Sequence, residues 1–569
     1  MSHLNQKLAL LTAGLALALP FAAQAQTLPY GDMGSSGDDS AAASDDDGGS
    51  SDHGSRQGRR IEVRPYIEAG AVAQFELSPG SETVTYSVLA AGVDTAINGR
   101  NNQGSLSLRY ERRFGLSGNT SDSDTISGVA RVASAIVPGA LQLEAGALAA
   151  RTSVEGSGAT VNSRFNDPSA SQVYSVYAGP TINTHMGDVA VTGGYRIGYT
   201  KVEAPDAIVT APGQTAVDVF DESVVHSAGL RAAVKPGDVL PVGVGIGVGY
   251  NREDVSNLDQ RVEDFHARGD VTLPVGANLA LVAGVGYEKV QVSSRDAVID
   301  TTTGLPVIGS DGRLVTDKSA PRVLAYDVSG LIWDAGVMWR PSRRTALEAH
   351  VGRRYGTTSY FGSFAYAPDQ RSSLNISVYD AIQGFGGQVN SALAGLPTEF
   401  EASRNPLSGN INSCVMAQAA GTCFGGALGS VRSAVFRSRG VMASYGVNMG
   451  RYQAGVAAGY DRRTFIAAPG TVLASANGVV DENTWIAAYF SGKLGRDAGF
   501  STNFYANRYQ SGDTFAGDVA GIGATAAYYR TILSGLTATA AVGIDGINRD
   551  DALEDLWTAS ALVGVRYTF

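Results

Sequence analysis

The side chains of this chain that could carry chemistry stand at alternate positions. DFHARGD (264–270) spaces two acids, a histidine and an arginine in this way, and LEAHVGRR (347–354) repeats the pattern. In an extended strand such positions share one face, which places imidazole beside carboxylate. That combination suits acid–base catalysis or metal binding. A metal needs three or four convergent ligands, and each stretch offers one histidine, so we expect solvated charges paired across neighbouring strands.

No other catalytic signature is present. The sequence has no G-x-S-x-G turn, no H-E-x-x-H helix and no Walker A loop. We therefore expect no enzyme, no cofactor and no metal centre. Acids and bases alternate along the charged face, which predicts a hydrated wall of mixed charge. The residues expected on this face are Arg109, Glu111, Arg113, Arg196, Asp264, His266, Arg268, Asp270, Asp334, Glu348, His350 and Arg354.

The elements that must position these residues are amphipathic strands. Counting back from Phe569 in steps of two gives only apolar residues, from Tyr567 to Trp557. At ~3.3 Å per residue this stretch is about 33 Å long, and a tilt of about 40° lets it cover the roughly 25 Å apolar band of an outer-membrane barrel. An edge strand of a soluble sandwich is the alternative. We expect the strand to close a barrel by pairing with the first strand near Tyr66 to Phe75.

The same alternation recurs along the chain after Ile61. In PVGVGIGVGY (241–250) one face is aliphatic and the other is glycine, and in 331–339 Trp333 and Trp339 share a face opposite Asp334. The pattern predicts about twenty-two strands, within a range of roughly 18–24, and an even number closes an antiparallel barrel with both termini on one side. The fold class is therefore all-β, a transmembrane antiparallel β-barrel over 61–569.

The connections between these strands differ on the two sides. Those on the side of Phe569 are short and rich in turn residues, such as VPGA and KPGD. We expect the long ones to be extracellular loops, at 152–170, 202–221, 293–325, 384–428 and 467–481. The glycine-rich 384–428 either folds inward and narrows the pore or lies over the rim. It holds the only two cysteines, Cys414 and Cys423, for which an oxidising compartment predicts a disulfide.

The N-terminus carries export signals. Lys7, an apolar run and Ala23-Gln24-Ala25 predict a signal peptide over 1–25. Residues 26–60 are rich in Asp, Gly and Ser, which predicts a disordered periplasmic segment. Such a segment is too short to be the plug domain of a TonB-dependent receptor. The net charge of −11 argues against nucleic acid as a partner.

One stretch resembles a known family. W-R-P-S-R-R-T (339–345), G-R-R-Y-G (352–356) and V-Y-D (378–380) resemble the outer-membrane β-barrels found with exosortase/PEP-CTERM exopolysaccharide systems, which are of a β-barrel porin type. The resemblance implies an outer-membrane barrel linked to an exopolysaccharide system. It supplies no catalytic residue.

These observations predict a cell outer-membrane protein with its N-terminal segment and C-terminus in the periplasm. The expected function is a porin-like channel for passive diffusion or export of small hydrophilic solutes or saccharide. The alternative is a non-conducting barrel that acts through its extracellular loops, in a structural role or in surface-polymer attachment. The expected partners are outer-membrane lipid and the barrel-assembly machinery. The terminal Phe569 resembles the signal that outer-membrane barrels present to this machinery.

Overall fold

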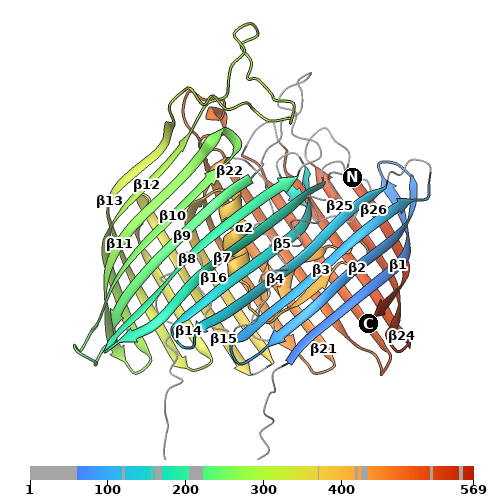
Figure 1. The fold of residues 1–569 in the computed structure, drawn as a ribbon, viewed down its shortest axis with the longest axis horizontal. Coiled ribbons are helices and arrows are strands. Elements are labelled where there is room, and N and C mark those ends of the chain that lie inside the picture. The colour runs from blue at the N-terminus through green and yellow to red at the C-terminus, as the bar shows by residue number, and fades with distance from the viewer. Residues whose placement is uncertain are drawn as a thin grey trace, which may run out of the picture.

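The computed structural model describes residues 60–117, 122–155, 158–160, 170–203, 222–369, 371–416, 421–423, 428, 434–512, 517–549 and 555–569. Within them the main sheet has 23 strands. One of these, β6 (Gly158–Thr160), pairs only with the end of β5, so 22 strands form the wall of a closed barrel (Figure 1). The predicted signal peptide and the predicted disordered segment lie outside the described residues, apart from Arg60.

Every strand of the wall pairs with its neighbours in the chain, and each pairing is antiparallel. The wall strands are β1 (Arg60–Ser78), β2 (Thr83–Asn98), β3 (Asn102–Gly115), β4 (Ser123–Val137), β5 (Leu141–Glu155), β7 (Ala170–Met186), β8 (Val189–Glu203), β9 (Glu222–Val234), β10 (Gly243–Val255), β11 (Gln260–Gly276), β12 (Leu279–Ser294), β13 (Val323–Ser342), β14 (Thr345–Arg354), β15 (Thr357–Asp369), β16 (Ser372–Gln383), β20 (Val435–Asn448), β21 (Tyr452–Ile466), β22 (Val480–Lys493), β23 (Ala498–Gln510), β24 (Val519–Leu533), β25 (Leu536–Arg549) and β26 (Leu556–Thr568).

The terminal strand closes the barrel, as predicted. β26 pairs with β1 from Tyr66 opposite Thr568 to Phe75 opposite Ala559. The backbone N–H of Phe569 adds a hydrogen bond to the carbonyl oxygen of Pro65, at 3.1 Å. A closed ring leaves no sheet edge, which is the condition for strands to span lipid. The predicted all-β transmembrane barrel of about twenty-two strands is therefore confirmed.

The outer face of the wall is apolar. Ile246, Leu331 and Val563 expose 63%, 67% and 70% of their surface, while Ile332, next to Leu331, is buried. Trp339 lies on the same face near the end of β13, as the predicted aromatic girdle requires. Among the described residues no helix is long and apolar enough to cross a membrane.

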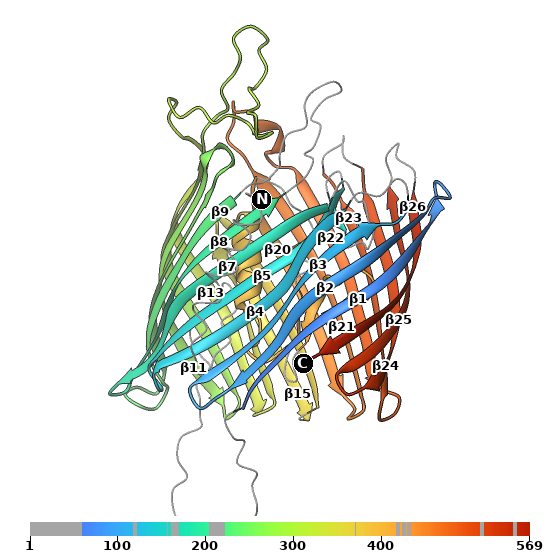
Figure 2. The ribbon, with the colours of Figure 1, turned by 45° about the vertical axis from the view of Figure 1, so that its right-hand side comes forward.

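The two rims of the barrel carry different connections. The rim at which β26 ends, here the C-terminal rim, has connections of at most eight residues, the longest being 235–242. The opposite rim, here the loop rim, carries the longer ones. Connection 295–322 projects well beyond it (Figures 1 and 2). The predicted asymmetry is therefore present, while 161–169 and 204–221 lie outside the described residues.

The longest connection turns into the barrel. Helix α2 (Phe385–Ala394) follows β16 and contacts β5, β7, β8, β9, β10 and β16 from inside (Figure 1). A small sheet follows, formed by β17 (Glu401–Arg404), β18 (Ile411–Met416) and β19 (Gly421–Cys423). We call residues 384–416 the inner segment. Of the two courses expected for 384–428, the described part takes the inward one.

Candidate functional site

The inner segment is held first by apolar packing. Phe385, Val389 and Leu393 of α2 are completely buried. They pack on apolar side chains that β5, β7 and β8 turn inward, among them Leu148 and Val173. Full burial of such a side chain contributes about 1.5–3 kcal/mol. This patch of the lumen wall is therefore a seat for the helix and differs from the polar lining expected of an open pore.

A buried carboxylate fixes the start of α2. Glu253 of β10 is 0% exposed and accepts the backbone N–H groups of Gly384 and Gly387, at 2.7 and 2.9 Å. An acid at this position satisfies donors that a helix leaves unpaired in its first turn and interacts favourably with the helix dipole. The sequence analysis missed this residue.

Polar side chains of α2 reach two separated parts of the wall. The Asn390 side-chain amide donates to the hydroxyls of Ser175 and Thr200, at 3.1 and 2.8 Å. The Gln388 amide donates to the Asp461 carboxylate on β21, at 3.3 Å. Helix α2 thus bridges the wall formed by β7 and β8 to β21 across the lumen.

After α2 the chain runs to the C-terminal rim. The Asn98 side chain, at the end of β2, donates to the Glu399 carboxylate at 2.8 Å. The Phe400 N–H then donates to the Ser105 hydroxyl at 3.1 Å. Leu407 packs on Ala527 and Ala541 of β24 and β25. The inner segment therefore spans the depth of the barrel and contacts several sides of its wall.

This course changes the reading of Arg109, Glu111 and Arg113. All three face inward as predicted, and both arginines form ion pairs with Glu111. They are almost fully buried, because the turn after β17 covers them, and Arg113 donates to the carbonyl oxygen of Ser408 at 3.0 Å. The expectation of solvated wall charges is wrong for this group. These three residues bind the inner segment, through contacts such as that between Arg113 and Ser408.

A second set of charges lies on β9, β11, β13 and β14. Arg231 binds Asp270 through two hydrogen bonds of 2.5 and 2.7 Å. Arg268 contacts Asp270 at 2.9 Å and binds Asp334 at 2.6 and 2.8 Å. The chain of contacts continues from Asp334 through His350 to Glu348. We call these six residues the charge ladder: Arg231, Asp270, Arg268, Asp334, His350 and Glu348.

His350 has a structural role in this ladder. Its Nδ1 lies 2.9 Å from Asp334 and its Nε2 lies 3.1 Å from Glu348. Ionised carboxylates only accept hydrogen bonds, so both ring nitrogens must donate and neither can act as a base. Among the described residues no three or more His, Cys, Asp or Glu side chains are placed to hold a metal ion.

Glycines on the neighbouring strands make the ladder possible. A Cβ added at Gly284 would lie 2.3 Å from Nε of Arg268, and one at Gly336 would lie 2.4 Å from Nδ1 of His350. Long side chains can therefore lie flat across the wall and reach the next acid. The glycine-only face predicted for β10 was a visible sign of this arrangement.

A third group lies near the loop rim. Arg354 binds Asp264 at 2.9 and 3.0 Å and lies 3.3 Å from Glu288, while the Tyr355 N–H donates to Glu288 at 2.6 Å. Tyr355 also belongs to a buried apolar cluster that joins β11 and β12 to β16, β20 and β21. His266 faces inward beside Asp264, at 3.6 Å.

The remaining predicted residues lie elsewhere. Arg196 faces inward and lies over the Tyr177 ring, 5.7 Å from its centroid. Cys414 and Cys423 are directly opposite each other in the pairing of β18 with β19. Their disulfide stays a prediction.

Comparison with known proteins gives no family. No family model matches the chain, and no curated protein matches it. Among solved structures it is similar to the FrpB iron transporter of Neisseria meningitidis, with 11% identity and a TM-score of 0.42, covering 89% of this chain and 82% of that one. It is also similar to the ferric-catecholate import receptor Fiu of E. coli K12, with 9% identity and a TM-score of 0.44, covering 88% of this chain and 81% of that one. For a loop-deletion mutant of OmpT, an outer-membrane protein of Vibrio cholerae, the identity is 9% and the TM-score is 0.26, and the match covers 90% of this chain and 99% of that one.

Proposed function

We propose that the protein is an outer-membrane channel for small hydrophilic solutes or saccharide, constricted by the inner segment. The observation that carries this proposal is the charge ladder. Its acids and bases neutralise one another along the lumen wall, in contacts of 2.5–3.1 Å. A wall of balanced charge exerts no strong selection on the sign of a solute. The expected substrates are neutral and rich in hydroxyl groups.

The same structure supports the proposed location. A closed antiparallel barrel with an apolar outer face suits lipid, since its strands pair around the whole ring and leave no free sheet edge. Barrels of this kind have short periplasmic turns and longer extracellular loops. We therefore assign the C-terminal rim, with Arg60 and Phe569, to the periplasm. Outer-membrane lipid and the assembly machinery are the partners that this location implies.

The non-conducting barrel is the second candidate, favoured by the tight anchoring of the inner segment. Connection 295–322 offers such a protein an ordered external surface. Backbone N–H donation from Thr302 lowers the pKa of Asp300 below its ordinary value, and the Ser319 hydroxyl does the same for the pKa of Asp317. Both acids thus hold local turns of the projecting loop. The resemblance to exopolysaccharide-associated barrels makes a surface saccharide the proposed ligand in either case.

Solute uptake into proteoliposomes distinguishes the two candidates. We expect osmotic swelling with neutral monosaccharides, slower swelling with disaccharides, and weak ion selectivity in planar bilayers. Arg268→Glu should shift the selectivity toward cations, because it removes the base between Asp270 and Asp334. The matched control is Arg353→Glu on the outer face of β14. If neither the complete barrel nor a barrel lacking 384–428 passes any solute, the channel is wrong and the non-conducting barrel replaces it.

A further inference from the structure

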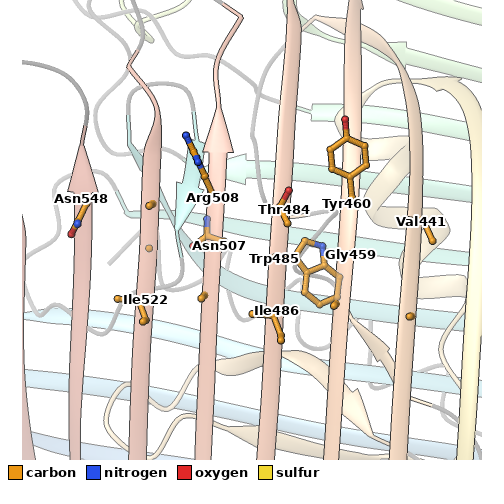
Figure 3. A pocket seen from close by; sticks show the side chains of 15 residues that line it. Val441, Gly459, Tyr460, Thr484, Trp485, Ile486, Asn507, Arg508, Ile522 and Asn548 are labelled. Atoms are coloured by element: carbon orange, nitrogen blue, oxygen red, sulfur yellow. The ribbon is translucent and has the colours of Figure 1, made fainter.

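The outer face of β20–β25 carries a groove, here the outer groove, of about 660 Å³. Strand register places most of its residues in two adjacent rows on the membrane side, and Gly459, Trp485, Asn507 and Gly521 lie between the two rows (Figure 3). The row nearer the C-terminal rim is Ala443, Ala458, Ile486, Ala506 and Ile522. Small alanines between larger neighbours hollow the surface, and a volume of this size is typical of ligand sites, which span about 300–1,000 Å³.

The upper row of the outer groove turns polar. Tyr460, Thr484, Arg508 and Asn548 lie here, on the side of the loop rim (Figure 3). Arg508 exposes 62% of its side chain and is 3.6 Å from Asp518. An amphiphile would therefore meet apolar surface in the lower row and a cation at the upper edge.

Further arginines lie along this edge. The pairing of β20 with β21 sets Arg439 directly opposite Arg462 on the outer face. Directly opposed like charges destabilise a sheet. Arg437 and Arg439 share a single acid, Asp380, at 2.6 and 3.4 Å. Arg462 has Glu482 at 3.5 Å. Asp380 and Arg437 expose only 0% and 12% of their side chains, so the exposed edge consists of Arg439, Arg462 and Arg508 beside Glu482 and Asp518, which leaves one positive charge in excess.

We propose that the outer groove binds a phosphate-bearing anionic membrane lipid, with an acyl chain on the alanine row and its phosphate on Arg462 and Arg508. The charge of the edge complements the headgroup, and the exposed apolar floor complements the chain. Arginine forks match phosphate oxygens bidentately, which makes them well suited to this role. The site is independent of the lumen and of what passes through it.

Native mass spectrometry of the detergent-solubilised barrel tests the proposal. The protein is incubated with equal amounts of phosphatidylglycerol and phosphatidylcholine of identical chains. We expect one retained phosphatidylglycerol in preference to phosphatidylcholine. Arg462→Gln or Arg508→Gln should weaken that preference about fivefold, the effect of one basic side chain near an anionic surface. The control, Arg353→Gln, removes an exposed outer cation on β14 and should leave the preference unchanged.

A second set of variants tests whether the lipid's acyl chain lies in the outer groove. Ala458→Trp with Ala506→Trp fills the groove and should abolish retention, while Ala335→Trp on the outer face of β13 should not. Heat-modifiable gel migration verifies folding, and Ala458→Phe alone replaces the double variant if that one fails to fold. Equal retention of both lipids by the wild type overturns the proposal. So does unchanged retention in the filled groove.

Discussion

Loosening the start of α2 should open the channel. Glu253→Gln keeps the size of the side chain and one acceptor oxygen, but it replaces the other oxygen with an NH2 group that cannot accept. Either Gly384 or Gly387 then loses its acceptor, and the other keeps only a neutral amide oxygen. A hydrogen bond to a charged group contributes about 1.5–3 kcal/mol, and the site is 0% exposed, so water does not replace it.

That loss sets the size of the effect. At about 1.4 kcal/mol for each factor of ten, the released state becomes roughly tenfold to a hundredfold more populated. It still remains a minority, because Phe385, Val389 and Leu393 hold the helix in its apolar seat. Leu393→Ala removes about 2–5 kcal/mol of that packing. The double variant should therefore open more often than either single variant.

Single-channel recording in planar bilayers measures how often the barrel opens. We expect wild type to show rare openings, Glu253→Gln more frequent openings of unchanged amplitude, and the double variant longer ones. Glu263→Gln, an outer carboxylate of β11, and Leu331→Ala, an outer side chain of β13, are the matched controls. The contrary result is that deletion of 384–428 opens the barrel while Glu253→Gln and the double variant behave as wild type. In that case Glu253 and Leu393 do not hold the inner segment in place, and the reasoning from their contacts is refuted.

Three further outcomes are expected. A cysteine introduced at Ser310 in the projecting connection should react with an impermeant reagent on whole cells, and one at Ser342 on the C-terminal rim should not; the reverse would invert the orientation. Deleting 567–569 should reduce outer-membrane assembly, seen by heat-modifiable migration, because β26 loses part of its pairing with β1, whereas export should stay intact. Replacing Cys414 and Cys423 with serine should remove a reduction-dependent shift in gel mobility; a wild type that shows no shift lacks the disulfide.

The wall of the barrel could be predicted because its signal is local and repeated. Alternation with period two appears in each strand separately, as in 241–250, where the outward side chains are Val244, Ile246 and Val248. Closure by Phe569 follows from the same pattern, since a barrel in lipid has no free edge. The same alternation also predicted correctly that charged side chains such as Arg109 and Arg113 face the lumen. It did not predict their burial.

The lumen depends on contacts between distant parts of the chain. The sequence of α2 is short and glycine-rich, and its partners lie on β5, β7, β8 and β10, so no local pattern identifies its seat. Glu253 reads as one more polar residue at the end of a strand, although it fixes the helix. The alternation around Arg113 shows only that its side chain faces inward. Its burial follows from the contact with Ser408, which lies 295 residues later in the chain.

The inward course of the chain is prepared in the wall itself. β15 and β16 pair only from Gly362 opposite Val378 to the C-terminal rim, whereas β16 stays paired with β20 as far as Gln383. The two strands therefore separate in the half of the wall nearer the loop rim. Unpaired backbone groups in lipid cost several kcal/mol each, so this break must be covered.

Side chains from β20 provide that cover. Arg437 binds Asp380 and donates to the Thr357 hydroxyl at 2.6 Å, and Arg439 donates to the Thr358 carbonyl oxygen at 2.9 Å. Because β16 separates from β15 over the residues that lead directly into Gly384, the wall and the inner segment form one continuous structure. The inner segment is therefore continuous with the barrel wall. In the proposed channel, releasing it would require the loss of particular contacts such as those of Glu253, while the surrounding strand pairing stays intact.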